Sequence, residues 1–81
     1  MSEIFRAFGL VFVIFSDDHP PPHVHVSGPG WGMKIVLSDP PDLVSIEGRA
    51  TRPEARKALK LARENLDRLL EAWENIHDRL D

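Results

Sequence analysis

The chain is short and has no extreme of composition, with 81 residues, 42% of them hydrophobic and 28% charged, a net charge of -3 and no cysteine. This length fits one small domain that buries only about 60–65% of its unfolded surface, and the lack of cysteine excludes disulfides, thiolate zinc sites and cysteine nucleophiles. Because the apolar run at residues 8–15 is too short to span a bilayer, we expect a single domain in the cytoplasm with no membrane contact.

Four strands are predicted in the first half of the chain. The first is rich in aromatic and β-branched residues, which indicates burial on both faces. The second alternates polar and apolar residues, and turn residues then lead into the third as a hairpin with a six-residue loop and Trp31 at its tip. The strands are expected at about 8–15, 23–27, 33–38 and 43–47. The sequence therefore predicts a four-stranded antiparallel meander.

A helix is predicted from about residue 52 to residue 79. Thr51 and Glu54 form a capping-box pattern, and Pro53 lies in the first turn, where its missing N–H costs little. Apolar residues then recur at alternating steps of four and three: Ala55, Leu59, Ala62, Leu66, Leu69, Trp73, Ile76 and Leu80.

One continuous helix of this length would be about 40 Å long, whereas a typical strand spans about 17–20 Å. Either the helix breaks near Asn65, or its C-terminal half overhangs the sheet and contacts another chain. We favour a contact with a partner or a second copy through Leu66, Leu69, Trp73, Ile76 and Leu80. The predicted fold is α+β, a four-stranded antiparallel sheet with one long or two short C-terminal helices packed on one face.

Three histidines lie close together around a proline block, at His19, His23 and His25. Alternation along a strand places His23 and His25 on one face and Val24 on the other. A His-x-His pair with this spacing can reach one divalent metal ion, and Asp17 or Asp18 offers oxygen.

His19 fits such a metal site less well. Three prolines bias the chain towards polyproline II, which would hold His19 about 12 Å from His23 if straight. Exposed His-x-His pairs also collect nickel or zinc without a biological purpose. We therefore expect no cofactor, and a metal at His23 and His25 is the lesser alternative.

General acid–base chemistry on RNA is a second interpretation of His19, His23 and His25. Two imidazoles beside a phosphodiester can transfer protons without a metal. A basic segment follows at residues 49–63, with six basic residues against one acidic. The candidate phosphate or partner contacts are Arg49, Arg52, Arg56 and Lys60, with Trp31 as a surface that stacks on a base. The structural alternative is that the histidines form hydrogen bonds within a rigid turn and the basic segment is solvated.

The chain combines Phe8-Gly9 and an apolar strand, the segment from Asp18 to Val26, further strands, and a helix that carries Leu69-Leu70-Glu71-Ala72-Trp73. In this combination it resembles the bacterial domain-of-unknown-function family 4160 (DUF4160) over nearly its whole length. The family signature maps onto His19, Pro21, Pro22, His23 and His25. Asn65 stands where a helix histidine is common in the family, so no role is carried over to that position.

The resemblance implies one component of a toxin–antitoxin-like pair, bound to a small DUF2442-like protein encoded beside it. The predicted function is therefore a partner-binding component with a histidine surface site that binds or cleaves RNA without a metal. The alternatives are a protein-binding module without chemistry and a divalent-metal protein.

Overall fold

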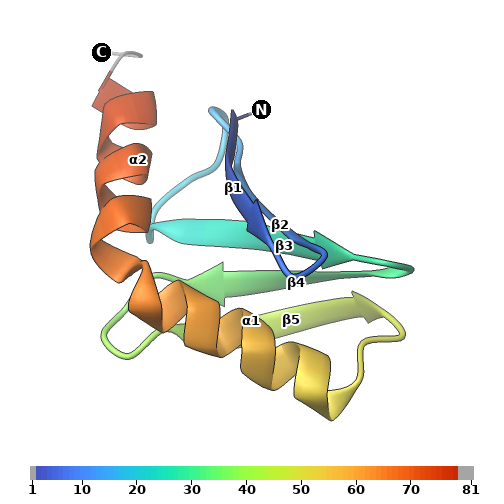
Figure 1. Ribbon diagram of the computed structural model, residues 1–81. Coiled ribbons are helices and arrows are strands. Elements are labelled where there is room, and N and C mark those ends of the chain that lie inside the picture. The colour runs from blue at the N-terminus through green and yellow to red at the C-terminus, as the bar shows by residue number, and fades with distance from the viewer. Residues whose placement is uncertain (1, 79–81) are drawn as a thin grey trace.

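The computed structural model describes residues 2–78, which form a five-stranded antiparallel sheet followed by two helices (Figure 1). The strands lie in the sheet in chain order, so the predicted meander is confirmed with one strand more than expected. The elements are β1 (Ser2–Ala7), β2 (Leu10–Ile14), β3 (His23–Gly28), β4 (Trp31–Val36), β5 (Asp42–Gly48), α1 (Arg52–Glu64) and α2 (Leu66–Asp78).

Strand β1 was not predicted, because the turn that joins it to β2 lacks the usual sequence signal. Ala7 pairs with Leu10, and the two residues between them, Phe8 and Gly9, have φ angles of 54° and 79°. Two-residue hairpins with positive φ at both positions favour Asn-Gly or Asp-Gly, and here a phenylalanine takes the first position. The predicted burial of 8–15 on both faces is wrong: β2 alternates between buried and half-buried residues.

The hairpin between β3 and β4 is tighter than predicted. Gly28 pairs with Trp31, so the connection is two residues long instead of six. Trp31 is therefore a strand residue, and the prediction that it lies at an exposed tip is wrong. Its indole is 6% exposed and lies so close to Gly28 that a Cβ there would overlap the ring. The indole Nε1–H donates to Glu54 Oε2 at 2.7 Å, which joins β4 to the start of α1.

The capping box at the start of α1 is confirmed. Glu54 N–H donates to Thr51 Oγ1, and Thr51 N–H donates to Glu54 Oε1 at 2.8 Å. A Thr N-cap contributes about 1 kcal/mol to stability. The sequence therefore predicts the start of α1 correctly.

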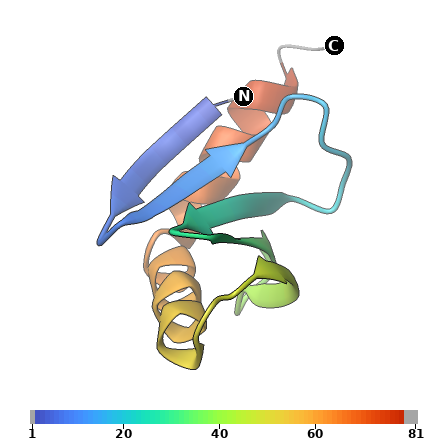
Figure 2. The same ribbon diagram turned by 90° about the vertical axis from the view of Figure 1, so that its right-hand side faces the viewer.

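The helix breaks at Asn65, as one of the two predicted alternatives requires. Asn65 Nδ2 donates to Leu61 O at 2.8 Å, and the backbone leaves helical geometry there, with φ -116° and ψ 22°. The favoured overhang is wrong, because the chain changes direction at Asn65 and α2 lies behind β1 and β2 in the view of Figure 2. Its residues Leu69 and Trp73 are 0% and 6% exposed. Leu80 and the predicted helix end at residue 79 lie outside the described residues.

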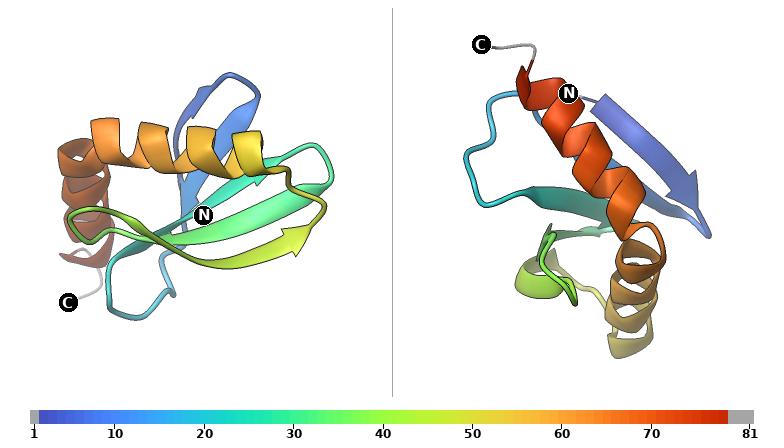
Figure 3. Two further views of the ribbon diagram at one scale, coloured as in Figure 1. Left: turned by 90° about the horizontal axis from the view of Figure 1, so that it is seen from below. Right: turned by 90° about the vertical axis from the view of Figure 1, so that its left-hand side faces the viewer.

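The two faces of the sheet differ in what covers them. Helix α1 runs along the strands, and α2 continues at a steep angle to α1 (Figure 3). Alternate strand residues meet the helices in one core, which includes Phe12, Ile14, Val24, Val26, Ile35, Ala58, Ala62 and Leu69. The opposite face, where His25 and Lys34 pair across β3 and β4, is less buried. Neither helix in residues 2–78 has both the length and the apolar character needed to cross a membrane.

We expect Glu54→Gln to destabilise the fold at pH 7 but not at low pH. The backbone N–H of Thr51, the Trp31 indole and the Thr51 hydroxyl lower the pKa of the Glu54 carboxyl below its ordinary value of 4.5. A lowered carboxyl pKa contributes stability that is fully present above pH 4.5 and is lost as the pH falls through the folded value. Urea unfolding of both proteins between pH 7 and pH 3 should show their difference shrink below pH 4.5. A difference that is constant with pH would contradict this role.

Candidate functional site

His23 and His25 lie at the start of β3, where Val24 between them is fully buried on the opposite face. The predicted alternation is therefore correct. The two imidazoles differ in environment, since the His23 side chain is 5% exposed and that of His25 is 36% exposed. Their ring centroids are 5.1 Å apart in an edge-to-face arrangement.

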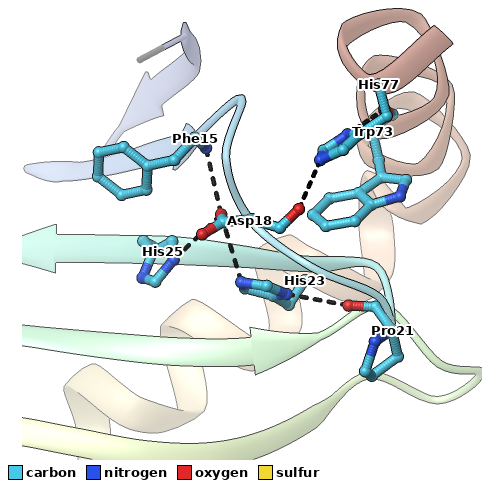
Figure 4. A network of polar contacts seen from close by, with 7 residues as sticks. All are labelled: Phe15, Asp18, Pro21, His23, His25, Trp73 and His77. Carbon is cyan, nitrogen blue, oxygen red and sulfur yellow. Dashed lines mark hydrogen bonds and ion pairs between the residues drawn. The ribbon is translucent and has the colours of Figure 1, made fainter. Parts of the chain in front are cut away.

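Both imidazoles point at Asp18, which the loop between β2 and β3 contributes (Figure 4). His23 Nε2 and His25 Nε2 each lie 3.3 Å from the same oxygen, Asp18 Oδ2. The N–H of Phe15 donates to this oxygen at 3.2 Å, and the N–H of Asp18 donates to Phe15 O. This local turn fixes the carboxylate, which is 17% exposed, above the start of β3.

The hydrogen-bonding pattern of His23 determines which ring nitrogen is free. His23 Nδ1 lies 2.9 Å from Pro21 O, and a carbonyl oxygen accepts only, so Nδ1 carries a hydrogen. In the neutral ring, Nε2 then presents its lone pair to the Asp18 carboxylate. Two lone pairs at this distance repel each other, so the arrangement calls for a proton or a cation between them.

His25 adds a second unsatisfied nitrogen to this site. Its Nε2 is buried and has no hydrogen-bond partner among residues 2–78, although it lies near Asp18 Oδ2. Phe15 packs edge-on against the His25 ring, with 4.9 Å between centroids. A buried polar atom without a partner costs free energy, which again favours an additional group at this position.

Helix α2 contacts the site through His77 and Trp73, neither of which the sequence predicted as a residue of the histidine site. His77 Nε2 lies 3.0 Å from Asp18 O, and its ring stacks on Trp73 at 3.8 Å between centroids. Trp73 in turn lies 5.2 Å from the His23 ring. These contacts fix the Asp18 backbone and the His23 ring at the same time. No sequence pattern predicts them, because 59 residues separate His77 from Asp18.

The third predicted histidine, His19, lies outside this cluster. It is exposed and borders a shallow hollow with Asp17, Pro20 and His77. Within residues 2–78, the residues whose donor atoms could together hold a metal ion are Asp18, His23 and His25, and these atoms all lie within 4.8 Å of one another. Asp18 therefore takes the place that the sequence offered to His19.

The basic residues do not surround the histidines. Arg49 N–H donates to Gly30 O at the turn between β3 and β4, whereas His23 opens β3. Five strand residues separate these ends, or roughly 17 Å. Arg56 and Lys60, which lie on α1, border a hollow together with Pro40 and Pro41 of the loop between β4 and β5. Arg52 opens α1 and is exposed, and Trp31 is too buried to stack on a base.

The apolar residues predicted to form an interface are divided by the structure. Leu69 and Trp73 lie in the chain's own core, which accounts for their apolar character without a partner. Leu66 and Ile76 are half-buried and pack against that core. The four of these residues that the structure describes, Leu66, Leu69, Trp73 and Ile76, therefore pack within the chain itself.

The donor set of Asp18, His23 and His25 has the chemistry of a transition-metal site. Two imidazoles and one carboxylate bind zinc and non-haem iron(II) in proteins, and such sets leave coordination positions open. In a tetrahedral site with bonds of about 2.0–2.2 Å, donor atoms lie about 3.3–3.6 Å apart. The two nitrogen–oxygen distances of 3.3 Å match this spacing. The hydrogen bond from His23 Nδ1 to Pro21 O is the outer-shell contact that orients such a ligand.

A family model described as "Domain of unknown function (DUF4160)" matches residues 9–74. This segment contains Asp18, His23 and His25, while His77 lies beyond it. No curated protein and no solved structure matches the chain.

Proposed function

This chain belongs to the DUF4160 family, a family of unknown function, and from the geometry of its site we propose that it binds one divalent transition-metal ion through Asp18, His23 and His25. The observation that carries the proposal is the approach of two imidazole Nε2 atoms to one carboxylate oxygen, at 3.3 Å each. This proposal gives more weight to a metal than the sequence alone does, because Asp18 supplies the third donor that His19 does not.

The experiment uses the untagged, chelator-treated chain. Zn²⁺ is titrated by calorimetry, and Co²⁺ is titrated with visible absorption as the readout. We expect one ion per chain and the intense Co²⁺ bands of four- or five-coordination. Sub-stoichiometric binding, or the weak spectrum of aqueous Co²⁺, would contradict a metal site and favour a purely structural cluster.

A second candidate function is the partner-binding component of a toxin–antitoxin-like pair, which the outer edge of β5 favours. This strand ends the sheet, so its outer edge is free among residues 2–78, and it exposes Val44 and Ile46 at 48% and 47%. A free edge with exposed apolar residues is a template for an added strand. The occupant we propose is a strand of the DUF2442-like partner, and it binds here rather than at α2.

The charges of β5 disfavour one register in which a second copy of this chain could pair with it. Antiparallel pairing of β5 with itself, centred between Val44 and Ser45, would place Asp42 opposite Glu47. Like charges directly opposite each other destabilise a strand pair. A partner strand with basic residues near its ends complements β5 better.

We expect Ile46→Lys to abolish co-purification with a co-expressed DUF2442-like protein, because it places a charge on the apolar edge. Phe8→Lys is the matched control, since Phe8 is 75% exposed at a different site and should leave the complex intact. Affinity purification from the same co-expression strain measures both. A complex that survives Ile46→Lys, or that both variants disrupt, would contradict docking at β5.

We do not propose metal-independent RNA cleavage, although the histidines suggested it. Such a reaction needs a cation beside the imidazoles to stabilise the developing charge on phosphorus. Arg49 lies at the end of β3 opposite to His23, and Arg52 opens α1. The predicted arginine contacts are therefore not beside the histidines, and the basic residue that pairs with His25 across β3 and β4 is Lys34.

A further inference from the structure

The outer side of α1 carries a row of cations that the proposed functions do not use. Arg52, Arg56, Lys60 and Arg63 follow one another at steps of four, four and three residues, so they lie on one side of the helix. All four residues are exposed. At a rise of about 1.5 Å per residue, the row is about 16–17 Å long. We call these four residues the basic row.

The protein's own acidic groups do not neutralise the basic row. None of its four residues forms an ion pair within residues 2–78. Glu54, which lies between Arg52 and Arg56 in the chain, is held instead by Thr51 and the Trp31 indole. Cations near a helix N-terminus oppose the helix dipole, so Arg52 and Arg56 do not stabilise α1 either. An anion from outside the chain would satisfy these charges.

Three cations of the basic row meet at one hollow beside the loop between β4 and β5. Arg56, Lys60 and Arg63 line this hollow, which has a volume of about 390 Å³. Two prolines of the loop and one half-buried leucine of α1 complete its lining, so no carboxylate lines it. Asp39 and Glu64 border a second hollow, which Arg63 shares. An anion in the first hollow is therefore held best on the side of Arg56 and Lys60.

The chemistry of the basic row fits a nucleic acid better than a protein partner. The large hydrophobic side chains that the described residues expose are Phe8, Val44 and Ile46, and none of them belongs to α1. The centre of a protein–protein interface is depleted of charge, whereas interfaces with nucleic acids are polar and strongly positive. Guanidinium groups also bind two phosphate oxygens at once. These properties favour phosphate groups that repeat along a chain.

We infer that the basic row binds the phosphodiester backbone of a nucleic acid, with one phosphate in the hollow beside Arg56 and Lys60. This hollow shares no residue with the metal donors Asp18, His23 and His25, and the row lies on α1 rather than on β5. Binding therefore requires neither a metal ion nor a partner strand. Because contacts to phosphate do not distinguish bases, the affinity depends on salt and not on sequence.

The test uses the full, chelator-treated chain and fluorescence anisotropy of a labelled single-stranded RNA and of a labelled duplex DNA of the same sequence. Four phosphate contacts to a single strand predict a slope of about -2.8 for the logarithm of affinity against that of salt concentration. The double variant Arg56→Gln/Lys60→Gln should weaken binding on the order of tenfold, the effect of two exposed ionic contacts. It should also reduce the steepness of the slope by about 1.4.

The matched control is Arg6→Gln/Lys34→Gln, which removes the same two charges from the sheet and should leave the affinity and the salt slope unchanged. Unlabelled poly-glutamate is added as a competitor. The tighter of the two labelled ligands identifies RNA or DNA as the source of the phosphates. No binding of either at low salt would overturn the inference, and equal effects of the two double variants would overturn the assignment to α1. Competition by poly-glutamate as strong as that by unlabelled RNA would overturn the nucleic acid in favour of an acidic protein.

Discussion

His25→Ala is expected to weaken Zn²⁺ binding on the order of 100-fold or more. Loss of an outer-shell partner alone costs about 10–100-fold in metal affinity, and this variant removes one of only three protein donors. His25 is the informative choice because its side chain is 36% exposed, whereas His23 is 5% exposed and packs near Trp73. Its loss therefore changes the site without leaving a cavity in the core. Calorimetric titration of Zn²⁺ into both proteins measures the effect.

His19→Ala is the matched control and should leave Zn²⁺ affinity unchanged, since His19 is exposed and lies outside the donor cluster. A thermal readout gives independent evidence. A ligand at 100 times its dissociation constant stabilises the folded state by about 2.7 kcal/mol, which raises Tm by about 10–20 °C in a domain of this size. Wild type and His19→Ala should show this shift and His25→Ala should not. Equal Zn²⁺ affinity in all three proteins would contradict the site.

The sequence was sufficient to place two of the three proposed metal donors and insufficient to place the third. His23 and His25 share a face because strand alternation has a period of two. Asp18 was only one of two acidic candidates, because its orientation depends on the hydrogen bonds with Phe15. The support from His77 depends on how α2 packs after the break at Asn65. The spacing of residues in the sequence predicts neither the orientation of Asp18 nor the contact of His77 with it.

In the fold, too, local patterns were predicted correctly, whereas contacts between separate elements were not. The capping box of Thr51 and the alternation of Val24 and Val26 are local patterns, and both predicted structure correctly. The position of Trp31 was mispredicted because the Gly-rich segment suggested a long loop. The burial of its indole against Gly28 and its hydrogen bond to Glu54 are contacts between separate elements. Helix length alone also could not decide whether α2 folds back.

Leu69→Ala is expected to cost about 2–5 kcal/mol of the free energy of unfolding, the usual effect of truncating a fully buried leucine. Leu69 is 0% exposed in the core that α2 shares with the sheet. Because a domain of this length has little stability to spare, the variant should be largely unfolded in mild urea.

Leu66→Ala is the matched control, on the same helix and with the same change of side chain. Leu66 is half-buried, so its truncation should cost clearly less than that of Leu69. Urea unfolding of the isolated chain, followed by circular dichroism, measures both variants. If α2 instead overhung the sheet and awaited another chain, neither leucine would be buried in the isolated protein and both variants would have similarly small effects. A marked difference between them thus tests directly whether α2, which holds His77 against Asp18, belongs to the chain's own core.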